Sequence, residues 1–455
     1  MSGTVGAQAL MLLAAPFLTR LFDTEDFGLL AVYAGLLALV GVVSKLRYEL
    51  AIPLPEADHE AANLVALCVL LVGATTIVSS ILVLCLGETL CGLLSVPRLT
   101  KYLWLLPVGV LLSGLYTAFN YWGVRKKQFG VIAGTRWRQA FATIAIQLSA
   151  FKLGPIALLL GQAAGQSAGI INLAKPLFGR PVFRQLSVVG IGSMMRRYRR
   201  FPIFSTGEGL ANTAGAQLPP LMFAGFFGAE AAGIYALAHR VLQLPMALIG
   251  KSVGQVFLAN AAEARREGTL GSLVEGVHDR LARISLPPAM VLMLAGPDLF
   301  ALVFGEQWRL AGECARWLSP WLYLVFVSSP MSTLFSVVER QDQGMAFQIL
   351  LLAARCGAIG LGAWIGEFLI AVKLFGTFSA ICWAGFLVWL GRAAGTRPSA
   401  MIRPTLSAFA VAQICSTPLW LVFASGMTSR INITIATALS GALVSGHYWN
   451  MRKRG

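Results

Sequence analysis

The chain has 455 residues, of which 57% are hydrophobic and only 12% are charged. A soluble domain carries about 25% charged residues, so this composition excludes a protein that faces water on all sides. The formal net charge of +16 would suggest a nucleic-acid partner in a soluble protein. Here the basic residues stand in short segments between long apolar blocks, so we predict a membrane protein with no nucleic-acid partner.

The apolar blocks predict an all-α polytopic membrane protein with about fourteen transmembrane helices. The pairs Pro219-Pro220 and Pro287-Pro288 predict breaks or bends in helices seven and nine. In chain order, the predicted spans are residues 4–20, 27–44, 62–86, 102–119, 138–151, 154–174, 202–225, 232–258, 284–304, 316–338, 346–366, 371–391, 405–424 and 431–448.

Orientation follows from the distribution of Lys and Arg, which concentrate in cytoplasmic loops. If the C-terminal residues Arg452, Lys453 and Arg454 are cytoplasmic, the cytoplasmic segments hold 25 basic residues, the opposite loops hold 8, and three lie within spans. We therefore predict a multi-pass protein of the inner (plasma) membrane with both termini in the cytoplasm.

The most basic loop joins spans six and seven and has no acidic residue. It fits either a topology anchor on anionic membrane lipid or an entry patch for a diphosphate lipid, and both interpretations place it on the cytoplasmic face. Its basic residues are Lys175, Arg180, Arg184, Arg196, Arg197, Arg199 and Arg200.

Two segments of the chain repeat one another. The triplet Gly-Ala-Gln at residues 6–8 recurs 209 residues later at 215–217, and Gly28 and Gly233 stand 205 residues apart in similar contexts. Six spans separate the copies, and this even number predicts two parallel six-helix repeats about an axis normal to the membrane. We predict lobes at residues 1–197 and 198–391, followed by two additional helices and a basic tail at 392–455.

Several stretches resemble the Wzx-type flippases of O-antigen and capsule repeat units, in the MOP transporter superfamily. The resemblance extends from residue 3 to about residue 390 and is most specific up to residue 61. Its residues are 16–22 (PFLTRLF), 25–28 (EDFG), 47–55 (RYELAIPLP), 60–61, 121–122, Arg125, Lys126, Phe129, 232–237 (AGIYAL), Arg240, Val241, Pro245, 304–305, Trp308 and 311–312.

The resemblance implies two six-helix lobes around a central cavity, which opens alternately to the two faces of the membrane. It also implies the substrate class, an undecaprenyl-diphosphate-linked oligosaccharide that is moved from the cytoplasmic to the outer leaflet for surface polysaccharide biosynthesis. Polysaccharide polymerase machinery is a further implied partner.

Charged side chains inside a membrane span are costly and should face a cavity or a partner. Arg240 and Lys251 lie in span eight, about three helical turns apart, so both can project toward one face; Arg355 lies in span eleven. Arg20 and Arg47 bound the first two spans at opposite membrane faces. A guanidinium matches phosphate oxygens bidentately, so we predict that these five cations bind the diphosphate of the substrate.

Two acidic residues are candidates for binding a coupling proton or Na⁺: Glu208 in span seven and Asp298 in span nine. Either could instead form an ion pair with one of the three intramembrane cations. For Arg20 and Arg47, the alternative is snorkelling at the interface, and Arg47 could also pair with Glu49.

Catalytic motifs are missing from the sequence. It contains no GxxxxGK[ST], HExxH or DxD motif, its seven cysteines form no CxxC, and its loops are too short for a catalytic domain. We predict that the chain is not an enzyme and has no catalytic residue, metal site, cofactor or bound ATP.

Three other functions are compatible with a polytopic membrane protein. A drug or cation antiporter of the same superfamily should favour acidic residues in its lumen, whereas cations outnumber acids here. A polysaccharide polymerase or ligase would need a large outer loop with Arg or His, and the four histidines form no cluster. A scaffold that transports nothing would tolerate alanine at Arg240 and Lys251.

Overall fold

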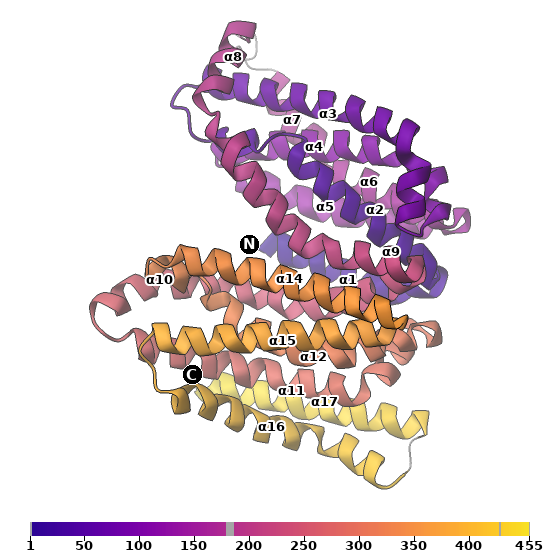
Figure 1. Cartoon of the computed structure of the whole chain (residues 1–455), viewed down its shortest axis with the longest axis vertical. Helices are drawn as coiled ribbons and strands as arrows, with labels where there is room; N and C mark the ends of the chain where they lie inside the picture. The colour runs from indigo at the N-terminus through magenta and orange to yellow at the C-terminus, as the bar shows by residue number, and fades with distance from the viewer. Residues whose placement is uncertain (1, 179–185, 427–428, 455) are drawn as a thin grey trace. The chain divides into compact units, whose positions relative to one another are not determined.

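The computed structural model describes residues 2–178, 186–426 and 429–454. The regular secondary structure of the described residues is entirely helical, with no β-strand (Figure 1). Its α-helices are α1 (Ser2–Leu21), α2 (Thr24–Val43), α3 (Asp58–Leu93), α4 (Leu105–Arg125), α5 (Phe129–Ser149), α6 (Pro155–Ser167), α7 (Ile170–Phe178), α8 (Val188–Arg197), α9 (Thr206–Pro245), α10 (Lys251–Arg266), α11 (Leu270–Phe304), α12 (Arg309–Ser328), α13 (Leu334–Val337), α14 (Gln341–Ile365), α15 (Phe368–Ala393), α16 (Pro398–Ala424) and α17 (Arg430–Arg454).

The all-α polytopic fold is confirmed. Each predicted span falls on helical segments of the chain, although spans 154–174, 232–258 and 316–338 each extend over more than one helix. Within the described residues, nine helical stretches are long and apolar enough to cross a membrane, and Gly6–Leu21 is a shorter apolar helix. The hairpin between spans five and six is also present. Gly154, with φ of 72°, makes the turn, and Pro155 occupies the first position of α6, where a missing N–H costs nothing.

Helix packing divides the chain into two compact units, Met1–Ala236 and Leu237–Gly455. In the first unit, α5 packs against α1 and α6, and α3 packs against α4. Its core is apolar, with Leu29, Val32 and Tyr33 of α2 fully buried. The Tyr33 hydroxyl donates to the Leu105 carbonyl at 3.1 Å, so this buried polar group is satisfied.

In the second unit, α11 is the central helix. It packs against α12, α16 and α17, and α12 packs against α15 (Figure 1). Gly296 and Gly312 let α11 and α12 approach closely, because a Cβ on either glycine would lie within 2.8 Å of the other's carbonyl oxygen. The last two helices are therefore built into this unit. The predicted limits of the six-helix lobes, 1–197 and 198–391, stay a prediction.

The two copies of the repeat meet within the first unit. A Cβ on Gly28 would lie 1.7 Å from the carbonyl oxygen of Ala229, and a Cβ on Gly233 would lie 2.0 Å from that of Thr24. Thr24 and Ala229 each precede the glycine of their own copy by four residues, so the contact is reciprocal, as at a two-fold interface. The repeat seen in the sequence thus corresponds to a symmetric helix contact.

The break in α9 lies at Gly228, and not at the prolines. Gly228 has φ of 86° and ψ of 174°, which is non-helical, so α9 consists of two helices on either side of it. The helix continues through Pro219-Pro220, and α11 continues through Pro287-Pro288. The proline pairs therefore do not break helices seven and nine, whereas the alternative that they bend these helices stays a prediction. Gly228 lies between the predicted spans 202–225 and 232–258. In membrane helices, neighbouring groups compensate for the missing N–H.

Candidate functional site

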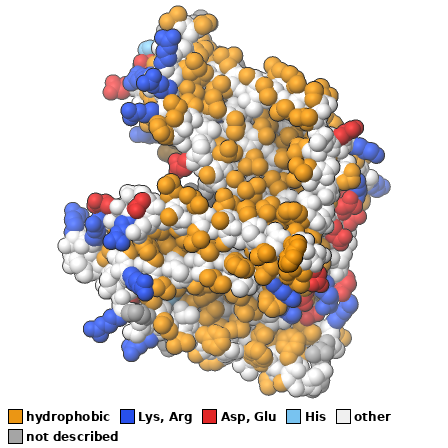
Figure 2. All heavy atoms as spheres, viewed as in Figure 1, with side chains coloured by type: hydrophobic (Ala, Val, Ile, Leu, Met, Phe, Trp, Pro, Cys, Tyr) orange, Lys and Arg blue, Asp and Glu red, His pale blue; other side chains and the backbone are white. Residues whose placement is uncertain are grey.

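Basic side chains lie at the ends of the helices of each unit. In Figure 2, the Lys and Arg atoms form a cluster over α8 in the first unit and another over α10 in the second, whereas apolar atoms cover the helices between the ends. Of the predicted basic loop, Arg180 and Arg184 lie outside the described residues. Arg197 pairs with Glu60 of α3 at 3.1 Å, which attaches the end of α8 to the first unit.

The proline-containing loop between α2 and α3 is held by one arginine. Arg125, at the end of α4, donates to the carbonyl oxygens of Pro53, Pro55 and Glu56 and pairs with Asp58 at 3.0 Å. Its side chain is only 10% exposed. One guanidinium thus satisfies several carbonyls of the loop, as its fork of five donors allows. Two of the stretches that carry the family resemblance, 47–55 and Arg125, therefore meet here.

The first part of the same loop holds a buried charged cluster. Glu49 is 2% exposed and Lys45 is 5% exposed. Arg47 lies between them in sequence with φ of 61°, and its Nη1 lies 3.8 Å from Glu49 Oε1. The alternative prediction that Arg47 pairs with Glu49 is confirmed. The Arg47 side chain keeps 29% exposure, so it can also reach a ligand.

The burial of Glu49 and Lys45 opposes their charges. Burial raises the pKa of Glu49, while the nearby cations Lys45 and Arg47 partly hold it down. For Lys45, burial lowers the pKa and the Glu49 carboxylate partly restores it. The Lys45 ammonium donates to the Gly41 carbonyl at 2.8 Å and to the Ser44 hydroxyl at 3.1 Å. Lys45 and Glu49 are thus costly to bury, which is typical of functional clusters.

A second candidate site surrounds Arg355 of α14 in the second unit. The guanidinium lies 5.2 Å from the ring centroid of Trp321 on α12 and 5.7 Å from that of Phe375 on α15. His239, from the second helix of α9, stacks on Trp321 with ring centroids 5.9 Å apart and also contacts Gln243 at 3.1 Å. These contacts are cation–π interactions, in which aromatic faces attract the guanidinium.

The other predicted cations are divided between the two units. Arg20 is exposed in the last turn of α1 in the first unit, and Arg240 is exposed directly after His239 in the second. Lys251 is the first residue of α10, but its side chain lies outside the described part of the chain. The structure therefore brings Arg47 to Glu49 and Arg355 to an aromatic cluster, and a binding role for the five cations stays a prediction.

The two candidate coupling residues differ in their surroundings. Glu208 is exposed in the first turn of α9, next to Gly209, which Arg47 contacts. Asp298 of α11 pairs with Arg309 at 2.8 Å, and Arg309 also pairs with Glu306. The Asp298 carboxylate is thus already paired with a cation from a neighbouring helix. A role of Glu208 or Asp298 in binding a coupling ion stays a prediction.

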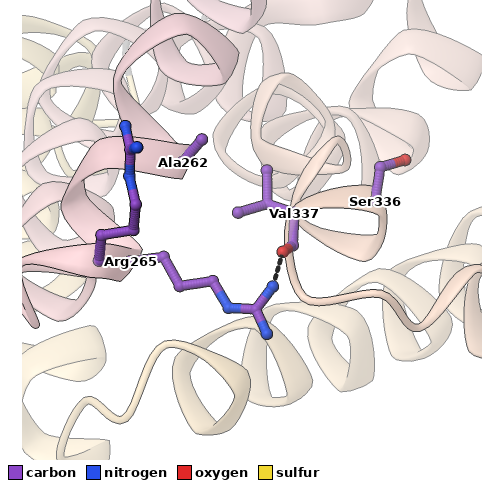
Figure 3. A pocket seen from close by; sticks show the side chains of 5 residues that line it. Ala262, Arg265, Ser336 and Val337 are labelled. Carbon is purple, nitrogen blue, oxygen red and sulfur yellow. Dashed lines mark hydrogen bonds between the residues drawn. The ribbon is translucent and has the colours of Figure 1, made fainter.

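A hollow of about 660 Å³ lies between the end of α10 and α13 (Figure 3). Ala262, Arg265 and Arg266 line it from α10, and Ser336 and Val337 line it from α13. The Arg265 guanidinium donates to the Val337 carbonyl, as Figure 3 shows, and pairs with Glu339 at 3.2 Å. The contact with Val337 joins α10 to α13, and it occupies one donor group of Arg265.

Comparison with known proteins identifies the family. Residues 17–312 match the family described as "Polysaccharide biosynthesis protein". The chain belongs to the polysaccharide biosynthesis protein family. The predicted resemblance is therefore confirmed, and this family member is a multi-pass membrane protein.

Two curated relatives are similar over part of the chain. The lipopolysaccharide biosynthesis protein WzxC of Escherichia coli (strain K12) is 24% identical over 350 residues, which are 76% of this chain and 70% of WzxC. The teichuronic acid biosynthesis protein TuaB of Bacillus subtilis (strain 168) is 26% identical over 183 residues. That match covers 38% of this chain and only 38% of TuaB.

Solved structures show the same fold. The lipid II flippase MurJ in an inward closed conformation superimposes with a TM-score of 0.76 at 11% identity, over 99% of this chain and 98% of MurJ. An inward-facing MATE multidrug transporter of the MOP superfamily gives a TM-score of 0.63 at 15% identity, over 85% of this chain and 94% of that one. This polysaccharide biosynthesis protein therefore has the MOP transporter fold. The two solved structures that share this fold are a flippase and a transporter by their titles, in agreement with the prediction that this chain is not an enzyme.

Sequence reasoning missed the groups that surround the predicted cations. Lys45 precedes Arg47 by two residues, but nothing in the sequence marks it as buried. Trp321 and Phe375 lie in apolar spans, where an aromatic residue reads as ordinary packing. Only the folded helices bring their rings against Arg355.

Proposed function

We propose that this polysaccharide biosynthesis protein is a flippase for undecaprenyl-diphosphate-linked oligosaccharides, which it moves from the cytoplasmic to the outer leaflet of the inner membrane. The transport would proceed by alternating access, with the polyprenyl tail in lipid and the headgroup on the protein. Family membership supports a role in polysaccharide biosynthesis, and the fold that it shares with MurJ and MATE transporters supports transport.

The observation that carries the proposal is the placement of arginines within membrane spans. Arg240 is exposed on the second helix of α9, and Arg355 lies against aromatic rings in α14. A guanidinium within a membrane span is energetically costly unless it contacts a partner or faces a cavity. A diphosphate is a suitable partner, because charge-assisted pairs with phosphate oxygens are strong in an environment of low dielectric.

The test is to delete the gene and to measure on which leaflet the lipid-linked oligosaccharide accumulates. We expect accumulation on the cytoplasmic leaflet and clearance by the wild-type protein. We expect Arg240→Ala and Arg355→Ala to clear it roughly 10- to 100-fold more slowly, the loss expected for one charge-assisted contact worth about 1.5–3 kcal/mol. Arg403→Ala is the matched control, because Arg403 is an exposed arginine of α16.

Other results would point to the competing functions. If the lipid-linked unit still reaches the outer leaflet in a cell without a redundant flippase, the proposal is wrong. Accumulation of unpolymerised or untransferred units on the outer leaflet would then favour a polymerase or ligase. If the leaflet distribution stays normal and only drug sensitivity changes, a drug antiporter is favoured.

A further inference from the structure

The ion pair between Arg47 and Glu49 is incomplete. Glu49 Oε1 lies 3.8 Å from Arg47 Nη1, whereas a full fork-to-carboxylate pair has two contacts of about 2.7–2.9 Å. Among the described residues, Glu49 Oε2 and Arg47 Nε are buried and have no hydrogen-bond partner. A buried carboxylate that is paired so loosely is poorly compensated for its loss of water. Its guanidinium partner is therefore easily drawn to a better acceptor.

The backbone and a neighbouring helix hold Arg47 in this position. Leu46 and Arg47 have φ values of 47° and 61°, a left-handed turn that non-glycine residues adopt at a cost. On its other side the guanidinium lies against Gly209 of α9, where a Cβ would be 2.4 Å from Nε and Nη2. Arg47 thus fits between Glu49 and a helix backbone with no space to spare, and its outer part remains exposed.

We propose that Arg47 exchanges between Glu49 and a phosphate group of the substrate, and that Glu49 binds a proton when Arg47 leaves. The phosphate in question is the diphosphate of the proposed function, so the inference rests on that function. No covalent bond to the substrate forms. One proton passes from water to a carboxylate oxygen of Glu49 when the diphosphate takes the guanidinium, and it returns to water when Arg47 comes back.

The groups around Glu49 favour this exchange. Lys45 and Arg47 are the cations that face it, and the titratable neighbours are Cys68 of α3 and Tyr121 of α4. The Lys45 ammonium is engaged with Gly41 and Ser44, so it does not replace the lost guanidinium. Because Arg47 helps to hold the pKa of Glu49 down, its departure raises that pKa further and favours proton uptake.

The test measures protons that are taken up when a diphosphate binds. The purified full-length protein in detergent is titrated with farnesyl diphosphate, a short polyprenyl diphosphate, in weak buffer with a pH indicator; binding is measured separately by calorimetry. We expect wild type to take up about one proton more per bound diphosphate than Glu49→Gln, the linkage of one carboxylate that changes its ionisation. Glu49→Gln should bind the probe at least as tightly, since its Arg47 is already released.

A second pair of variants moves Arg47 without changing any charge. Gly209→Ala places a methyl group where the guanidinium lies, and Arg47 must shift because it is the flexible partner. Glu49 should then be protonated before the ligand arrives, so the additional proton uptake is lost as in Glu49→Gln. Gly207→Ala, on the same helix with nothing within 4 Å of its Cβ, should behave as wild type.

The inference is overturned if wild type, Glu49→Gln and Gly209→Ala bind the probe with equal proton uptake. It is also overturned if Gly207→Ala loses the uptake as fully as Gly209→Ala, because Arg47 would then not be the cause. If the wild-type protein does not bind the diphosphate at all, both the inference and the proposed substrate class are wrong. The leaflet measurement described above is unaffected by the proton result, so the two failures can be told apart.

Discussion

Glu49 and Lys45 make the first unit sensitive to pH. Burial favours the neutral form of each side chain, so the pKa of Glu49 lies above its ordinary value of 4.5 and the pKa of Lys45 lies below 10.5. For Glu49, the folded protein holds its proton at pH values where the unfolded chain has released it. The free energy of unfolding therefore falls as the pH rises from about 4.5 through the folded pKa of Glu49.

We predict that Glu49→Gln removes this part of the pH dependence. The variant should lose less stability than wild type as the pH rises above 4.5, because an amide does not ionise. The measurement is the free energy of unfolding in detergent, followed by circular dichroism, at a series of pH values from 4.5 to 8. Glu56→Gln, an exposed position of the same loop, should keep the wild-type dependence. Equal pH profiles for the two variants would contradict the assignment.

We predict that Arg125 stabilises the loop between α2 and α3 more than any other single side chain does. Its replacement by alanine leaves the carbonyls of Pro53 and Glu56 without this donor and leaves Asp58 with Lys126 alone. We expect a loss of about 2–4 kcal/mol in the free energy of unfolding. Arg138→Ala, an exposed arginine of α5, should change it by less than about 0.5 kcal/mol. If both variants change the free energy of unfolding by a similar amount, the contacts of Arg125 with the loop do not stabilise the protein.

At the level of helices, the reciprocal contact at Gly28 and Gly233 predicts that neither position can carry a side chain without loss of stability. Gly28→Ala would bring a methyl group to 1.7 Å from a backbone carbonyl, which cannot move aside as a flexible side chain can. We expect a loss of at least about 1–3 kcal/mol, measured as unfolding in detergent. Gly41→Ala is the control on the same helix: its Cβ would meet nothing within 4 Å, and alanine is the better helix former. If Gly28→Ala is as stable as Gly41→Ala, the two helices do not approach this closely.

The positions of helices were largely predictable from sequence, because a span must be about 20 apolar residues long. The effect of prolines inside a helix was less predictable. The helices continue through Pro219-Pro220 and Pro287-Pro288, because neighbouring groups can compensate for the missing N–H. The non-helical residue Gly228 falls between the predicted spans 202–225 and 232–258. Each local choice depends on packing that a single sequence does not show.

The candidate site was predictable only in part, for a related reason. Arg47 and Arg355 stand out because charges in apolar surroundings are rare, and Glu49 was one of the alternatives considered as a partner of Arg47. The aromatic partners of Arg355 come from α12 and α15, more than 15 residues away along the chain. Burial of Lys45 likewise depends on the fold of the loop. A sequence identifies unusual charges, and tertiary structure decides what faces them.

At the scale of the whole molecule, the ion pairs within each unit connect loops that lie at the same end of its helices. In the first unit, Arg98 pairs with Glu25 at one end, whereas Arg125 pairs with Asp58 at the other. In the second unit, Arg430 pairs with Glu306 at one end, and Arg265 pairs with Glu339 at the other. In every case the paired loops are those that the span count places on one side of the membrane. The alternation of spans and the folded contacts thus agree, and the remaining question is which end is cytoplasmic.

We predict that the ends with α8 and with the turn at Gly268 face the cytoplasm, because they carry most of the basic residues. Single cysteines are introduced into a cysteine-free variant and treated with a membrane-impermeant maleimide in right-side-out and inverted vesicles. Arg199→Cys and Glu267→Cys should react only in inverted vesicles. Lys101→Cys and Arg430→Cys, exposed positions at the opposite ends, should react only in right-side-out vesicles, and the cysteine-free chain should not react in either. The reverse pattern would place the basic ends outside, and it would require that the positive-inside bias of 25 against 8 residues be opposed during insertion.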